Sequence, residues 1–551
     1  MEKYPLKKNQ DIELTITGIT AEGSGVGHHD GIAVFVPNTA ESDVITCHII
    51  KTKKNYAVGK MLNIIKPAKT RIIPDCGVFS KCGGCVFRHI DYAAECEMKR
   101  QRVKDAFQRL GHIDIEPEKI IKSGNTNRYR NKAQYPVRFE NGKLSIGFFA
   151  QNSHRVIDCR DCMLQPKEFS KILGVFETWI TKNKITVYNE ETRKGLLRHI
   201  YIRKAFSTNQ IMVCAVINGH NLPKKDDLII SLLKAADNIA SIAVNENTND
   251  SNVILGKKCS VIWGSDYIED ILCGVKVRIS PLSFYQVNRA QAEQLYNKAA
   301  EYAGVSENDT LLDLYCGAGT IGLSMAHKVK KLIGVEIIPE AIEDANINAE
   351  INHITNAEFI CGDAPKAAEI LRNRGIRPDV IIVDPPRKGC APELLETISQ
   401  MSPDRLVYVS CDPATLARDC AILKEKGYEV KKVTPVDMFP RTAHIETVVL
   451  LSQRRPDTHI DIKLDLSELD ITAAETKATY QEIKDYVFEK FGLKVSSLYI
   501  SQVKRKLGLE VGESYNKPKS VDARQPKCTD EKEQEIIAAL EHFKMSQSIK
   551  K

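Results

Sequence analysis

Hydrophobic and polar residues follow different periods in different parts of the chain, and this divides it into segments. Over residues 10–66 the two kinds alternate in short runs, at 14–17, 33–36 and 44–47, with glycines between them. Alternation of this kind predicts about five short strands, an arrangement typical of an OB-like β-barrel. Such barrels often bind nucleic acid on a basic face, and residues 51–54 form a basic turn. An inert β-domain is the alternative.

The middle of the chain begins with a predicted helix and continues with strands. Residues 91–110 read as a charged helix that ends at Gly111. Residues 128–282 alternate again, as at 200–203 and 211–216, and predict a β-rich region. Its first strand carries basic residues with two tyrosines between them: Arg128, Tyr129, Arg130, Lys132, Tyr135 and Arg138. A basic strand with aromatic side chains suits a phosphate backbone, and a solvated sheet face is an equally good interpretation.

From residue 283 the pattern changes to strands that alternate with helices. Apolar strands are expected at 310–314, 331–335, 358–360, 380–383 and 407–409, and helices at 290–302, 339–352 and 392–401. This order predicts a doubly wound, mostly parallel sheet. Residues 479–491 and 496–507 read as two further helices with a basic end, suited either to RNA or to solvent, and residues 517–526 as a loosely structured stretch.

Composition narrows the class of protein. The 551 residues are 43% hydrophobic and 27% charged, as in a soluble globular protein of several domains. The net charge of +7 permits a nucleic-acid partner without requiring one. The chain has no apolar run long enough for a membrane span and no apolar signal core at its start, so we expect a cytoplasmic protein with no membrane contact. There, the 16 cysteines are expected to bind metal or take part in catalysis rather than form disulfides.

One group of cysteines has the spacing of metal ligands. Cys76, Cys82 and Cys85 form a C-x5-C-x2-C motif with glycines between the thiols. A fourth ligand would come from Cys96, Cys159 or Cys162. Four thiolates suit either zinc or an iron–sulfur cluster. A single C-x2-C pair with a remote fourth cysteine favours a cubane cluster over a zinc knuckle.

A glycine-rich loop follows the first strand of the α/β region. Gly317, Gly319 and Gly322 match G-x-G-x-x-G, and Glu336 ends the next strand, where an acid can bind ribose hydroxyls. This pattern fits NAD enzymes and S-adenosylmethionine enzymes alike. The carboxylate of Asp313 would repel a pyrophosphate, so the loop favours S-adenosylmethionine, whose adenine Asp363 is placed to meet.

Two residues further along are candidates for catalysis. Cys411 follows the strand at 407–409, where ligands of an open α/β sheet lie, and a thiolate is a strong nucleophile. Asp384 and two prolines form a stiff loop after the neighbouring strand. Glu446 stands just ahead of an apolar strand and can remove a proton if its pKa is suitably tuned.

Taken together, these motifs resemble the RNA uracil-5-methyltransferase family over residues 10–455. The resemblance rests on the motifs at 283–288, 313–317, 384–387, 410–413 and 444–446. It implies a multidomain chain: an OB-like RNA-binding TRAM barrel at 1–67, a central β-rich iron–sulfur domain at 68–282 and a Rossmann-like class I methyltransferase domain at 283–455. Helix 92–110 would pack on the last of these. Residues 456–551 form a helical extension outside the common pattern. A barrel combined with a cysteine cluster looks like the 23S rRNA branch, and the same chemistry on tRNA is the alternative.

The resemblance also implies residue roles. Cys411 would add to C6 of uracil, C5 would take the methyl group of S-adenosylmethionine, and Glu446 would remove the C5 proton. The implied methyl-donor positions are Gln286, Tyr315, Thr320, Glu336, Asp363 and Asp384, and Phe284 would pack on the base. The implied 4Fe–4S ligands are Cys76, Cys82, Cys85 and Cys162, with Cys159 the weaker candidate for the fourth. Two other classes, an NAD-type oxidoreductase and a non-catalytic RNA-binding protein, fit these residues less well.

Overall fold

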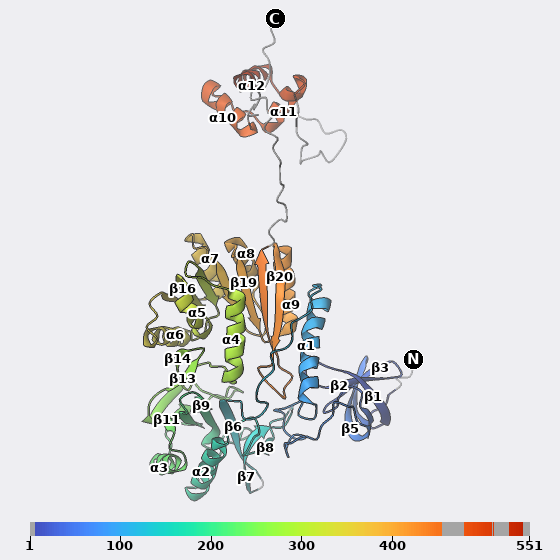
Figure 1. Cartoon of the computed structure of the whole chain (residues 1–551), viewed down its shortest axis with the longest axis vertical. Coiled ribbons are helices and arrows are strands. Elements are labelled where there is room, and N and C mark those ends of the chain that lie inside the picture. The colour runs from blue at the N-terminus through green and yellow to red at the C-terminus, as the bar shows by residue number, and fades with distance from the viewer. Residues whose placement is uncertain are drawn as a thin grey trace. The chain divides into compact units, whose positions relative to one another are not determined.

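The protein is described from a computed structural model of the whole chain. The structure describes residues 6–140, 142–151, 153–453, 479–509, 511 and 528–543. The chain forms two compact units, Met1–Arg455 and Pro456–Lys551 (Figure 1). Within the described ranges, none of the helices combines the length and apolar character needed to cross a bilayer.

The N-terminal strands close into a barrel, which confirms the predicted fold of this segment. Its strands are β1 (Asp11–Ile19), β2 (Gly25–His29), β3 (Ile32–Val36), β4 (Val44–Thr52) and β5 (Tyr56–Lys66), in the order β1-β2-β3-β5-β4. Strict alternation along β1 turns Ile12, Leu14 and Ile16 into the barrel core, because successive side chains of a strand point to opposite faces.

The central region is a seven-stranded sheet in the order β12-β11-β10-β9-β6-β7-β8. The strands are β6 (Lys132–Glu140), β7 (Lys143–Phe149), β8 (Val156–Asp158), β9 (Leu197–Lys204), β10 (Ile211–Ile217), β11 (Ile239–Glu246) and β12 (Lys258–Gly264). Two helices that the alternating pattern had not indicated, α2 (Glu168–Lys182) and α3 (Lys225–Ala235), contribute apolar residues to the core of this sheet. A hairpin of β13 (Ile268–Leu272) and β14 (Val275–Ile279) leads onward.

The second seven-stranded sheet confirms the predicted α/β region. Its order is β17-β16-β15-β18-β19-β21-β20, and β21 runs antiparallel to both of its neighbours. The strands are β15 (Thr310–Leu314), β16 (Lys331–Glu336), β17 (Ala357–Cys361), β18 (Val380–Val383), β19 (Arg405–Ser410), β20 (Tyr428–Val436) and β21 (Glu446–Gln453). The helices are α4 (Arg289–Ala303), α5 (Thr320–Met325), α6 (Pro339–Ile351), α7 (Ala364–Asn373), α8 (Pro392–Met401) and α9 (Pro413–Glu425), with a 3-10 turn at Ala326–Lys328. Two apolar cores, one for each face, bury the central strands completely.

Helix α1 (Tyr92–Arg109) joins the barrel side of the molecule to this sheet. It packs against α9 and β20, and Cys96, Val103 and Phe107 enter the core on that face (Figure 1). The side chain of Asp91 caps its first turn by accepting two backbone N–H groups.

The C-terminal unit contains α10 (Tyr480–Phe491), α11 (Ser497–Lys506) and α12 (Asp530–His542). The first two match the predicted helices, and Thr479 and Ser496 cap them. The sequence had not indicated α12, whose Ile536 and Leu540 pack with α10 and α11 in a core of their own. The stretch predicted to be loosely structured, 517–526, lies outside the described residues.

Candidate active site

The candidate nucleophile and the candidate base lie at the ends of neighbouring strands. β19 ends one residue before Cys411, and β21 begins at Glu446. The two strands are antiparallel with Ser410 opposite Thr447, so Cys411 leaves the sheet beside the point where Glu446 enters it. Cys411 is half-buried, whereas Glu446 is only 5% exposed.

Burial and nearby carboxyl groups shape the protonation of this pair. Burial, followed by Glu446 and Asp384, raises the pKa of the Cys411 thiol to about 11, and Arg387 acts in the opposite direction. Burial, then Asp384, holds the pKa of Glu446 well above its usual range. Burial also raises the pKa of Asp384 to about 7. Without a ligand this site therefore retains protons, and a cationic ligand would favour the anionic forms.

Acidic residues gather at the carboxyl ends of the parallel strands, where an open α/β sheet binds its ligand. They are Glu336 at the end of β16, Asp363 after β17 and Asp384 after β18. The carboxylate of Glu336 accepts the N–H of Gly317 at 3.2 Å and that of Ile337 at 2.8 Å, which fixes it beside the glycine loop. Asp363 precedes α7, and its side chain makes no capping hydrogen bond.

The position of Asp313 differs from the one expected from the sequence. Its side chain was expected to face a ligand, but it is only 1% exposed and lies beneath the glycine loop. One carboxyl oxygen accepts the N–H of Gly322 at 2.9 Å, and burial raises its pKa to about 7. A Cβ at Gly322 would lie 2.9 Å from the same oxygen, so only glycine fits there. Asp313 thus braces the loop from below.

The remaining predicted methyl-donor positions lie around the same strand ends. Tyr315 follows β15 with a φ of +67°, in the left-handed region. Thr320 is the first residue of α5, and its hydroxyl lies 3.3 Å from that of Tyr296. Gln286 lies between β14 and α4, two residues after Phe284, whose ring is 71% exposed and free to meet a base.

A cavity of about 380 Å³ opens onto Cys411. Segments far apart in the sequence border it, among them the barrel loop at Ala21, the loop that carries Cys76, Cys82 and Cys85 (the cysteine loop) at Gly84, α1 at Arg102, and the segment before β21 at His444. Three guanidinium groups line it, those of Arg102, Arg130 and Arg387. Arg387 also lies 3.5 Å from Nδ1 of His444. The carboxyl groups of Glu22 and Asp412 also line the cavity, so beside the thiol three guanidinium groups stand against two carboxyl groups, and this positive excess suits an anionic ligand.

Arg102 had no predicted role at this site. This residue lies on α1, far from the motifs in sequence, and only the packing of α1 against the sheet brings it here. Its guanidinium donates to the carbonyls of Ala21 and Ala443, so it joins the barrel to the segment that leads to Glu446.

The basic stretch at 128–138 is neither the continuous phosphate-binding face nor the solvated sheet face that the sequence suggested. Tyr129 and Tyr135 are buried, and Arg138 is buried and pairs with Glu190. Tyr135 and Arg138 lie on β6, which is flanked by β9 and β7, whereas Tyr129 precedes this strand and donates its hydroxyl to the carbonyl of Pro440. Of this set, Arg130 is the residue that reaches the cavity at Cys411.

Five cysteines that are separated in sequence line a second cavity, of about 280 Å³: Cys76, Cys82, Cys85, Cys159 and Cys162. The third candidate for a fourth ligand, Cys96, lies instead in the core beneath α1. Among the described residues, no three His, Cys, Asp or Glu side chains are set as ligands of a single metal ion. The cavity walls include Phe79, Phe148 and Phe149 together with the cations Arg88, Arg130 and Lys132, so the thiols face a largely apolar space with positive charge at its border.

The fold and the acidic residues at its strand ends are those of a class I S-adenosylmethionine-dependent methyltransferase with an added RNA-binding barrel. The chain belongs to the tRNA (uracil-5-)-methyltransferase family, whose sequence model matches residues 91–454. The TRAM domain model matches residues 5–62 and thus the barrel.

Individual relatives agree with this assignment. An uncharacterized RNA methyltransferase of Clostridium tetani is 46% identical over 448 residues, which cover 81% of this chain and 97% of that protein. Another from Halalkalibacterium halodurans is 44% identical over 451 residues, 82% of this chain and 98% of that protein. Among solved structures, the Pyrococcus abyssi tRNA (uracil-54, C5)-methyltransferase in complex with S-adenosyl-L-homocysteine is 28% identical, with a TM-score of 0.66 over 80% of this chain and 99% of that one.

Proposed function

We propose that this enzyme methylates C5 of a uridine in 23S rRNA, forming 5-methyluridine through a covalent adduct between Cys411 and C6 of the base. The proposed chemistry rests on one observation: the half-buried thiol of Cys411 and the buried carboxyl group of Glu446 lie at the same end of two adjacent strands. The acidic strand ends beside them suit a methyl donor that carries a positive charge. We propose a cytoplasmic location for this activity, in keeping with ribosomal RNA as the proposed substrate.

The residues of the site supply each step. S-adenosylmethionine, held by Gln286, Tyr315, Thr320, Glu336, Asp363 and Asp384, supplies an electrophilic methyl group on a sulfonium. Cys411 adds as thiolate to C6 of a uracil turned out of its stack, and this makes C5 nucleophilic. After C5 has taken the methyl group, Glu446 accepts the C5 proton and the C6–S bond breaks. Burial holds the pKa of Glu446 well above its usual range in the free protein, and the positive charge of the bound methyl donor would favour the carboxylate form that can accept a proton.

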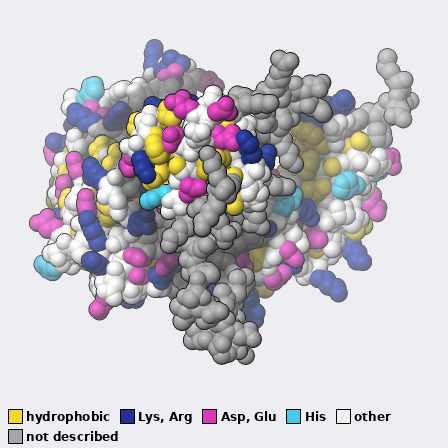
Figure 2. All heavy atoms as spheres, turned by 90° about the horizontal axis from the view of Figure 1, so that it is seen from above, with side chains coloured by type: hydrophobic (Ala, Val, Ile, Leu, Met, Phe, Trp, Pro, Cys, Tyr) yellow, Lys and Arg dark blue, Asp and Glu magenta, His cyan; other side chains and the backbone are white. Residues whose placement is uncertain are grey.

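The surroundings of Cys411 support an RNA substrate. Arg102, Arg130 and Arg387 line the cavity, and the exposed ring of Phe284 is available to stack on the flipped base. Phosphate contacts would offset the cost of unstacking the target nucleotide. Elsewhere, on the face seen in Figure 2, Lys and Arg side chains are interspersed with Asp and Glu. RNA contacts are expected around the cavity at Cys411, because the target base must reach this thiol and three guanidinium groups lie beside it.

We also propose that Cys76, Cys82, Cys85 and Cys162 hold a 4Fe–4S cluster. The donor set fits, because these thiols share one cavity with apolar walls, and a four-iron cluster spaces its ligands more widely than a single ion does. Cys159 is the alternative fourth ligand. The cluster would brace the cysteine loop and take no part in methyl transfer.

The same chemistry on tRNA is the second candidate, and the Pyrococcus abyssi structure favours it. The test is methylation of 23S rRNA and of total tRNA, each isolated from a strain that lacks the gene, with nucleoside mapping of the products. 5-Methyluridine at a discrete rRNA position supports the proposal, and product in tRNA alone overturns the choice of substrate. Failure of 5-fluorouridine RNA to form a conjugate through Cys411 in the presence of methyl donor overturns the mechanism.

A further inference from the structure

The segment that leads into Glu446, residues 437–445 between β20 and β21, is held through its backbone by several other parts of the chain. Its carbonyl groups accept hydrogen bonds from side chains as follows: Asp437 from Gln291, Met438 from Asn288, Phe439 from Lys99, Pro440 from Tyr129 and Ala443 from Arg102. The same segment supplies part of the cavity wall at Cys411. Its conformation therefore sets both that wall and the direction from which Glu446 enters the site.

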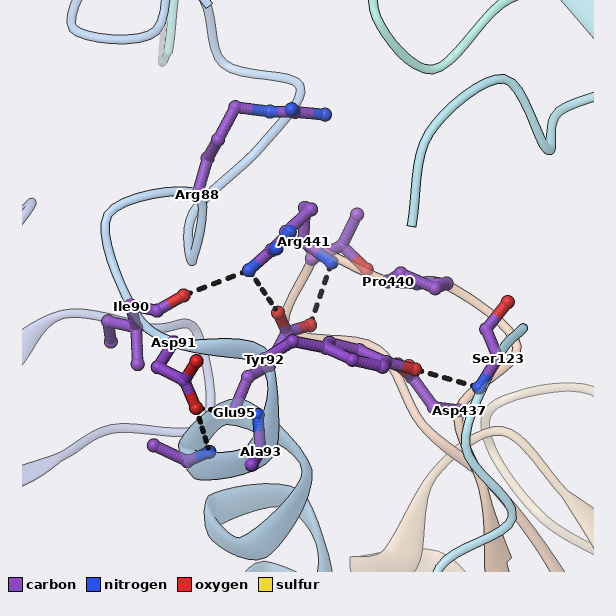
Figure 3. A network of polar contacts seen from close by, with 12 residues as sticks. Arg88, Ile90, Asp91, Tyr92, Ala93, Glu95, Ser123, Asp437, Pro440 and Arg441 are labelled. Atoms are coloured by element: carbon purple, nitrogen blue, oxygen red, sulfur yellow. Dashed lines mark hydrogen bonds and ion pairs between the residues drawn. The ribbon is translucent and has the colours of Figure 1, made fainter. Parts of the chain in front are cut away.

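Arg441 lies at the middle of this segment and connects it to α1 (Figure 3). Its backbone N–H donates to Oε1 of Glu95 at 2.7 Å. Its guanidinium donates to the carbonyl of Ile90 at 2.9 Å and to Oε2 of Glu95 at 3.4 Å. The φ of Arg441 is +68°, in the left-handed region that glycine adopts more easily than a residue with a side chain.

The carbonyl of Arg441 connects the segment to the cysteine loop. It accepts the N–H of Val86 at 2.9 Å and that of Phe87 at 3.2 Å, the residues that directly follow Cys85. One residue thus joins the cysteine loop, α1 and the segment before Glu446.

A buried ion-pair network holds the first residue of the segment, Asp437. Glu95 accepts from Lys99 at 2.8 Å, and Lys99 donates to Asp437 at 2.7 Å. Glu95, Lys99 and Asp437 are each at most 2% exposed. Asp437 also accepts from the hydroxyl of Tyr92 at 2.8 Å. Removing one of these buried charges would leave its partners uncompensated, so the network opposes a rearrangement of this end of the segment.

We propose that Arg441 is a positioning residue that holds Glu446 in register with C5 of the target base. The inference rests on the proposed function. The step concerned is the last one: the C5–H bond breaks, the proton goes to the Glu446 carboxylate, its electron pair forms the C5–C6 double bond, and the C6–S electron pair returns to Cys411. Cysteine addition and methyl transfer precede this step. Misplacing Glu446 therefore traps the methylated adduct on the enzyme.

The test compares Arg441→Gly with Arg193→Gly in the full-length protein. Glycine suits the positive φ at both positions, +68° and +57°, so each variant keeps its backbone and loses only a side chain. Arg193 is 66% exposed and pairs with Asp250 at the surface, which makes it a matched control. Arg441→Lys, which keeps the positive charge, is the conservative variant.

The measurements are kcat, KM for S-adenosylmethionine, melting temperature and the fraction of ordinary uridine RNA bound covalently to protein. We expect Arg441→Gly to lower kcat by about tenfold or more, since small misplacements of a reacting group are costly. KM should stay near that of the unchanged protein, and adduct carrying the transferred methyl group should accumulate. Arg441→Lys should recover part of kcat, and Arg193→Gly should match the unchanged protein.

Two outcomes overturn the inference: unchanged kcat without adduct in Arg441→Gly, or a lower rate of adduct formation that accounts for the whole loss of kcat. If Arg441→Gly does not fold, Arg441→Lys decides by the same two measurements. Failure of the unchanged protein to form a 5-fluorouridine conjugate is a distinct result, because it overturns the proposed function itself.

Discussion

Ser410 lies opposite Thr447 in the antiparallel ladder between β19 and β21. This pairing fixes the positions of Cys411, which follows Ser410, and of Glu446, which precedes Thr447. A shift of one residue would turn every side chain of a strand to the other face of the sheet. Cys411 and Glu446 therefore meet through the register of the sheet rather than through a flexible loop.

The first prediction separates the roles of these two residues. Cys411→Ala should abolish both methylation and covalent capture of RNA, because no nucleophile remains. Glu446→Gln should lower turnover by about 100-fold or more, the usual effect of losing a proton-transfer group, yet still capture RNA. Gel analysis of protein–RNA conjugates together with methyl incorporation checks both. Normal turnover in Cys411→Ala would rule out the covalent route.

The second prediction concerns stability and pH. Burial raises the pKa of Asp313 and of Asp384 from 3.8 to about 7. Between these two pH values the folded protein therefore binds more protons than the unfolded chain. In the absence of ligand, these two groups should stabilise the protein most below about pH 4. This contribution to the free energy of unfolding should be lost as the pH rises through about 7. Asp384→Asn should weaken the dependence and raise the melting temperature at neutral pH.

The same substitution should weaken binding of the methyl donor, because the carboxylate that would face the sulfonium is lost. Calorimetric titration at two pH values checks this, with Asp404→Asn as a control, because Asp404 lies just before the amino end of β19, at the opposite end of that strand from Cys411. Equal affinity in Asp384→Asn and the unchanged protein would contradict the placement of the donor.

The third prediction distinguishes the candidate cluster ligands. Cys162→Ser should lower the iron and sulfide content of anaerobically purified protein and bleach its visible absorbance, because a cubane cluster needs four thiolates. Cys159→Ser should keep both. Cys96→Ser is the control, since this cysteine lies in another core. Stoichiometric zinc in place of iron would refute the cluster.

The fourth prediction concerns the C-terminal unit. The core of α10, α11 and α12 is separate from the cores of the preceding unit, and the family model ends at residue 454. A chain that stops at Arg455 should therefore keep its melting temperature and its methylation of a short RNA substrate. Loss of activity on the short substrate would mean that the extension belongs to the catalytic machinery.

Sequence patterns located the strand ends well, since glycine and proline mark backbone requirements that are local. The glycine loop after β15, the prolines after Asp384 and the cysteine after β19 all lie where their motifs indicated. The buried position of Asp313 was not foreseen, because a carboxylate under a loop and one facing a ligand have the same neighbours in sequence.

Features that depend on packing between distant segments could not be predicted from the sequence. Glu95 and Arg441 are 346 residues apart, and each reads by itself as a surface charge. Tyr129 and Tyr135 read as an aromatic binding face, but burial depends on which strands flank β6. Likewise α2 and α3 are amphipathic helices inserted between strands whose alternation dominated the pattern.

The raised pKa of the Cys411 thiol has a consequence for the life of the enzyme between reactions. Peroxides attack thiolates far faster than protonated thiols. A nucleophile that keeps its proton until substrates arrive is a poor target for such oxidants, so Cys411 in the idle protein should be oxidised more slowly than a permanently ionised cysteine.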